Sequence, residues 1–160
     1  MICNPGPLPF AICVVLALSC GGSPAAPAQA LQVTSVASFN TDGGAFPMET
    51  TLAIRDQATW QHLWAQLNST RIPAPALPSI DFTTEMLVVA AMGPKPTGGY
   101  QIAINGATEQ GGTVTVSVTA TSPGSCMVAQ VLTSPVAVSK LPLRSGEVKF
   151  SIVRQVKNCD

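Results

Sequence analysis

The sequence predicts a β-rich α+β fold in which an antiparallel sheet, curled or paired as a sandwich, carries one amphipathic helix. Valine, threonine, serine, alanine, glycine and proline dominate the chain, which favours strands joined by many turns. Several runs alternate apolar and polar residues with the period of a strand, and one segment has the period of a helix. With 160 residues and no internal repeat, we expect a single folded domain.

Charge is sparse and balanced. Eight basic and eight acidic residues cancel, and charged residues make up 10% of the chain, where soluble domains carry about 25%. The sequence therefore has no basic stripe of the kind that binds nucleic acid. We expect a protein partner and no nucleic acid.

The first thirty residues predict export and a membrane anchor. The apolar run at residues 8–18 has the length of a signal-peptide core and is short for a bilayer span. It ends at Ser19 and Cys20, where the segment Leu-Ala-Leu-Ser-Cys resembles the lipobox of bacterial lipoproteins.

We therefore expect a signal peptide at residues 1–19 and a lipid-modified Cys20, followed by a flexible tether to residue 30. The globular domain would cover residues 31–160, held at the bacterial cell envelope by lipid at the outer membrane or cell surface. An ordinary cleaved signal ending near Ala30 is the alternative.

The first strands and the helix follow from local patterns. Residues 31–39 and 49–55 are expected strands, with a turn at residues 41–44 between them. Asp56 is a favourable N-cap, and four apolar residues follow it at the spacing i, i+3, i+4 and i+7. They predict a helix face that packs on the sheet: Trp60, Leu63, Trp64 and Leu67.

The second half of the chain predicts further strands. The run at residues 113–119 alternates valine with threonine and serine, and the Gln-Gly-Gly before it is typical of a hairpin turn. The expected strands of this half cover residues 85–92, 100–107, 113–119, 127–133, 136–139 and 147–156.

The segment from Gly93 to Gly99 holds two prolines and three glycines between two of these strands. It cannot extend either strand, because proline removes a ladder donor and glycine favours turns. We expect this loop to project from the sheet, with Lys95 near its tip and exposed. The residues that we expect to bind a partner are Pro94, Lys95, Pro96, Thr97, Gly98, Gly99 and Tyr100.

Two cysteines fall within the expected domain, Cys126 and Cys159. In an exported chain such a pair predicts a disulfide, here across 159 − 126 = 33 residues. A nucleophilic Cys126 is the alternative, and two free thiols are another. The nucleophile lacks a convincing base, since His62 is the only histidine and is expected on the helix.

Several segments in order resemble one family. They are Trp-x-x-Leu-Trp at residues 60–64, Asp81-Phe82, the loop from Gly93 to Tyr100, a valine-rich strand, Pro-Gly-Ser-Cys at 123–126 and Thr-Ser-Pro at 133–135. The order resembles the PrcB C-terminal-domain family over roughly residues 36–153. This resemblance implies a non-catalytic bacterial lipoprotein that binds or stabilises a protease within a surface complex.

A local resemblance offers an alternative function. The segment from Lys95 to Tyr100 is similar to a loop of chagasin-like cysteine-protease inhibitors, which are immunoglobulin-like β-domains. It implies that residues 94–100 inhibit a protease. The Arg-Pro-aromatic loop of those inhibitors is not found in this sequence, and the helix around Trp60 departs from their all-β fold.

No catalytic constellation stands out. Asp81 is expected to cap a turn with its own side chain, and His62 lies off the apolar face of its helix. The sequence has no phosphate-binding loop and no cluster of cysteine, histidine and aspartate at ligand spacing. We therefore expect no enzyme activity, no metal and no cofactor.

Overall fold

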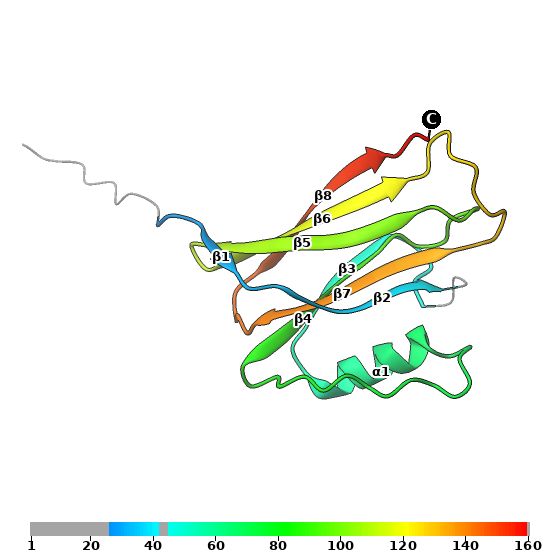
Figure 1. Cartoon of the computed structure of the whole chain (residues 1–160). Coiled ribbons are helices and arrows are strands. Elements are labelled where there is room, and N and C mark those ends of the chain that lie inside the picture. The colour runs from blue at the N-terminus through cyan, green and yellow to red at the C-terminus, as the bar shows by residue number, and fades with distance from the viewer. Residues whose placement is uncertain (1–25, 42–44, 160) are drawn as a thin grey trace, which may run out of the picture.

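The apolar run after Glu85 forms a strand buried on both faces, β4 (Glu85–Ala91). Its neighbour β7 (Ser134–Pro142) is buried in the same way. Both lie at the centre of a sheet that has packed layers above and below it (Figure 1). Continuous apolar runs are typical of such strands, because neither face meets water.

The structure is a computed structural model that describes residues 26–41 and 45–159.

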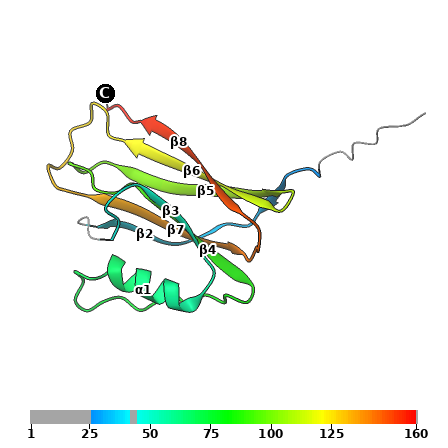
Figure 2. The same ribbon diagram turned by 180° about the vertical axis from the view of Figure 1, so that it is seen from behind.

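Two four-stranded sheets pack face to face. The middle sheet has the order β2-β7-β4-β3, with β2 at Thr34–Thr41 and β3 at Thr50–Ile54. The outer sheet has the order β1-β5-β6-β8. Its strands are β1 (Gln29–Leu31), β5 (Gln101–Gln110), β6 (Thr113–Ser122) and β8 (Val148–Val156). The outer sheet lies over one face of the middle sheet, and the helix covers the other (Figure 2).

Alternation along β4 divides the core into two layers. Met86, Val88 and Ala90 face the outer sheet, where they pack with the buried valines of β6. Leu87 and Val89 face the helix instead. Burying a valine or leucine side chain contributes about 1.5–3 kcal/mol, so both layers stabilise the sheet between them.

The helix α1 (Gln57–Leu67) forms as its sequence predicts. The carboxylate of Asp56 accepts a hydrogen bond from the backbone N of Thr59, which satisfies a free donor of the first turn. Trp60 is fully buried on the middle sheet, and Trp64 packs edge-on against Phe39. The indole Nε1 groups of Trp60 and Trp64 also donate to the carbonyl oxygens of Pro78 and Pro75, at 3.1 Å each, in the segment that follows the helix.

The predicted fold class is confirmed, with three corrections to its elements. The expected first strand is two strands, because the chain leaves the outer sheet after Leu31 and enters the middle sheet at Thr34. Residues 127–133 are not a strand. They carry the chain from β6 in the outer sheet to β7 in the middle sheet, where no ladder partner continues beside them.

The third correction concerns strand direction. We expected antiparallel pairs throughout, yet β6 and β8 are parallel. The cause is the intervening strand: β7 runs back through the middle sheet, so the chain returns to the outer sheet at the end where β6 began. A parallel neighbour is the result.

Charged side chains close one side of the sandwich. The guanidinium of Arg154 on β8 makes two hydrogen bonds to the carboxylate of Glu49, beside β3, at 2.8 and 3.0 Å. Arg55, at the other end of β3, donates to the carbonyl oxygens of Arg144 and Gly146. These contacts join β3, at the edge of the middle sheet, to β8 and to the loop that precedes β8. Within residues 26–41 and 45–159, no helix is long and apolar enough to cross a membrane.

Candidate protein-binding surface

The glycine loop, residues 93–99, joins β4 to β5 and depends on two glycines. Gly93 has a φ of 67°, and a Cβ there would lie 2.7 Å from the backbone carbon of Met48. Gly99 has a φ of 82°, and a Cβ there would lie 2.6 Å from a side-chain carbon of Val128. Both positions therefore combine a left-handed backbone with close packing, which only glycine satisfies without strain.

We expected the glycine loop to project freely from the sheet. It does not, because it is hydrogen-bonded to the β6–β7 loop (residues 123–133). The backbone N of Lys95 donates to the carbonyl O of Thr133 at 2.7 Å, and the reverse bond measures 3.0 Å. The backbone N of Gly98 donates to the carbonyl O of Ala129 at 2.8 Å. The Thr133 hydroxyl donates to the carbonyl O of Thr97 at 2.7 Å. Together the two loops form one structural unit.

Lys95 is half-buried rather than exposed. Its ammonium lies 5.7 Å from the centre of the Tyr100 ring, within the range of a cation–π interaction. Thr97 is half-buried too, whereas Pro94 and Pro96 are exposed. Of the predicted site residues, Pro94, Pro96 and Gly99 are therefore exposed, and the others are half-buried.

The β6–β7 loop adds apolar side chains that the sequence did not indicate as a site. Met127 is fully exposed, and Val131 and Leu132 are more than half exposed. We had placed these residues in a strand. No local signal excluded a strand, because the turn at Pro123 and Gly124 is followed by an apolar run without proline or glycine. We call the two loops together the loop surface.

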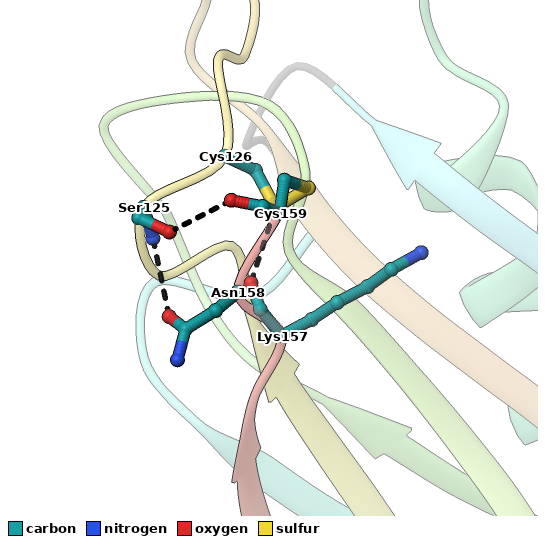
Figure 3. The surroundings of a disulfide bond; sticks show 5 residues. All are labelled: Ser125, Cys126, Lys157, Asn158 and Cys159. Carbon is teal, nitrogen blue, oxygen red and sulfur yellow. Dashed lines mark hydrogen bonds between the residues drawn. A yellow bond between two sulfur atoms is a disulfide. The ribbon is translucent and has the colours of Figure 1, made fainter.

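The predicted disulfide between Cys126 and Cys159 is confirmed (Figure 3). It ties the start of the β6–β7 loop to the chain after β8. Hydrogen bonds reinforce this junction: the backbone N of Ser125 donates to the side-chain oxygen of Asn158, and the Ser125 hydroxyl donates to the carbonyl O of Cys159. A pocket of about 180 Å³ opens beside the disulfide, lined by Gly99, Gln101, Pro123, Cys126, Val128, Lys157 and Cys159.

Two carboxylates, those of Asp81 and Glu49, accept hydrogen bonds that hold local structure. Asp81 caps a turn as predicted: its carboxylate accepts hydrogen bonds from the Thr83 hydroxyl and backbone N, and these bonds hold its pKa below the ordinary value. The hydrogen bond from Arg154 lowers the pKa of Glu49 in the same sense. His62 is exposed on α1, as expected. Among the residues whose placement is described, no three of His, Cys, Asp or Glu cluster as metal ligands would.

Comparison with known protein families gives a match to part of the chain. A family model described as PrcB C-terminal matches residues 86–142. The resemblance expected from the sequence is confirmed over this segment. No curated protein and no solved structure matches the chain.

The PrcB C-terminal match covers only the central part of the fold. It runs from β4 to the end of β7, so it contains the glycine loop and the β6–β7 loop. The expected resemblance was wider, and the Trp-x-x-Leu-Trp helix, Asp81 and Cys159 lie outside the matched segment. Cys20 and the expected signal peptide lie outside the residues that the structure describes.

Proposed function

We propose that this protein is an exported, lipid-anchored and non-catalytic domain that binds protein, as an accessory subunit of a secreted or surface protease complex. The loop surface carries the proposal. It presents exposed apolar side chains on a backbone held by four hydrogen bonds between two loops, all within the PrcB C-terminal segment.

The loop surface is both ordered and exposed. Solvent-exposed apolar side chains that gather on one surface favour association, because their burial removes apolar area from water. Loop-to-loop hydrogen bonds and the neighbouring disulfide restrict the loops before binding, so less conformational entropy is lost on association. The surface presents little charge, with Lys95 as its cation, which matches a partner bound mainly by apolar contact.

A capture experiment tests the loop surface. The tagged full chain is used to capture proteins from its native membranes, and the Leu132→Ser variant removes an exposed apolar side chain of the β6–β7 loop. We expect capture of a protease to fall about tenfold with unchanged melting temperature, since exposed substitutions usually shift stability by less than about 0.5 kcal/mol. Lys95→Ala should act in the same direction.

The matched control is Val153→Ser, which removes an exposed apolar side chain from β8. It should leave capture unchanged. Equal capture by all three variants, or capture of no protease, would overturn the proposal. The captured protease should keep its activity; inhibition of a papain-type protease by the purified chain would establish the inhibitor alternative instead.

A further inference from the structure

The strand β5 has an edge that no other described strand covers. On one side, β5 pairs with β6 along its whole length, from Gln101 to Gln110. On the other side, β1 pairs only with Ala107, Thr108 and Glu109. Figure 1 shows β1 beside one end of β5 alone. Between residues 101 and 106, backbone N–H and C=O groups therefore face outward with no strand beside them in the described part of the chain.

Three other edges of the two sheets, those of β8, β2 and β3, carry features that oppose strand addition. On β8, Lys149 and Arg154 place charges along the edge strand. The edge strand β2 has a bulge at Val36, where its pairing register shifts. Glu49 and Arg55 flank β3; Glu49 binds Arg154 on β8, and Arg55 binds carbonyl oxygens of the loop before β8. Charges and bulges of this kind are how proteins block edge-to-edge pairing.

The free edge of β5 lacks such features over four regular residues. Gln101 to Ile104 contain no charge and no proline, and the first bulge lies at Asn105. An edge of this kind is a template for another extended chain, which gains main-chain hydrogen bonds by adding to the sheet.

A pocket next to this edge can receive a side chain. Its volume is about 260 Å³, and its lining comes from both sheets: Ser38, Phe39, Tyr100, Gln101, Ile102, Ala103 and Pro135. Phe39, Ile102 and Pro135 are buried and give the pocket an apolar wall, while Ser38 and Gln101 add polar groups. Because side chains alternate along a strand, an added strand would direct every second residue toward the two-sheet interior. The pocket thus has room for one such side chain, and its apolar wall can pack against an apolar residue.

We infer that β5 captures an extended segment of a partner protein by strand addition at residues 101–104, with an apolar side chain of that segment in the pocket. The segment would lie antiparallel to β5, in line with β1. The inference rests on the proposed function and deepens it, because Tyr100 and Gln101 join this edge to the glycine loop and Gln101 lines the pockets on both sides.

The position of the chain's own N-terminal part favours an external occupant. The backbone carbonyl O of Ala26 accepts a hydrogen bond from the Gln110 side chain. The chain therefore enters the fold at the opposite end of β5 from the free edge. A partner already seated on the loop surface has direct access to Gln101, whereas the described chain begins, at Ala26, at the far end of the strand.

The test uses random peptides of about twelve residues, selected for binding to the purified full chain and then synthesised. Hydrogen exchange of the chain's backbone amides is measured with and without a selected peptide. We expect exchange to slow about tenfold or more at every second amide between residues 101 and 104, since alternate residues face the free edge. Methylation of backbone nitrogens in the peptide should abolish binding at alternate positions only.

A matched pair of variants locates the pocket. Ser38→Trp fills it from β2, and Ser151→Trp places the same side chain on the exposed face of β8. Peptide affinity should fall about tenfold for Ser38→Trp and stay unchanged for Ser151→Trp. Both variants should keep the melting temperature of the parent chain.

Several outcomes would overturn the inference: no enriched peptide, protection confined to the loop surface, equal affinity of both variants, or pairing of this edge with a second copy of the chain, seen as a dimer by ultracentrifugation. Because library peptides replace the native partner, this result is separate from the capture experiment. Peptide binding can fail while Leu132→Ser still reduces protease capture, and the reverse can also occur.

Discussion

Lys95 and Thr133 exchange two backbone hydrogen bonds, of 2.7 and 3.0 Å, although 38 residues separate them (133 − 95). This bridge makes the glycine loop and the β6–β7 loop a single unit. Strain in one loop is therefore transmitted to the other, and substitutions that distort the backbone of either loop should affect both folding and binding.

The contact of Gly99 with Val128 gives a matched pair of substitutions. Gly99→Ala should lower the free energy of unfolding by about 1–2 kcal/mol from its positive φ alone, with a further loss from the crowded Cβ. Gly98→Ala should be nearly neutral, because its Cβ would lie 3.4 Å from the nearest atom, the carbonyl O of Ala129. Urea denaturation measures both. Equal stability of the two variants would show that Gly99 is not required by its conformation.

Removal of the disulfide should cost stability without abolishing the fold. Cys159→Ser opens a loop of 33 residues, for which chain-entropy arguments give about 3–4 kcal/mol. Cys126→Ser should cost the same amount, and a reductant should bring the parent chain to the stability of either variant. Thiol alkylation of the native, oxidised chain at both cysteines would contradict the pairing.

The Glu49–Arg154 pair should make stability depend on pH. The pKa of Glu49 lies below its ordinary value of 4.5 because Arg154 donates hydrogen bonds to the carboxylate. The unfolded chain then binds a proton more readily, so the pair stabilises the fold above pH 4.5 and this contribution is lost as pH falls through the folded pKa.

The measurement compares the free energy of unfolding of the parent chain and Glu49→Gln across this pH range. The difference should be present at neutral pH and vanish in acid. In an Arg154→Gln background the same substitution should give no such pH-dependent difference. A difference that persists at pH 2–3 would assign the effect of Glu49→Gln to packing instead.

Lipid attachment at Cys20 is tested by mass. Protein extracted from membranes should begin at Cys20 and carry two or three acyl chains, since one chain alone gives marginal membrane binding. Cys20→Ser should release the domain into the soluble fraction with its melting temperature unchanged. A mature chain that begins near Leu31 and carries no lipid would support the ordinary cleaved signal.

The helix and the hairpin turn could be predicted from the sequence, because both depend on residues close together in the chain. The spacing of Trp60, Leu63 and Leu67 with Asp56 before them predicted α1 nearly to the residue, and two glycines after Gln110 predicted the hairpin. Both glycines have positive φ, as a tight two-residue turn requires. Such features need no knowledge of where the rest of the chain lies.

Relationships between the sheets could not be predicted in this way. The parallel direction of β8 follows from the path of β7 through the other sheet, which no local pattern records. The exposure of Met127 and Leu132 has the same origin, because an apolar run that crosses between sheets has no ladder to bury it. The glycine loop was correctly expected to be a loop, but its bond to Thr133 is a long-range contact.

The hydrogen bond between Gln110 and Ala26 fixes where the described chain enters the fold, at the end of β5 away from the glycine loop. Ten residues of β5 at about 3.3 Å each place the glycine loop about 30 Å from the end where the chain enters. A domain held through its N-terminal side, by a lipid or by a tag on a sensor chip, would present the loop surface at its far end. The loops would then point away from the surface that holds the domain, so a large partner could reach them.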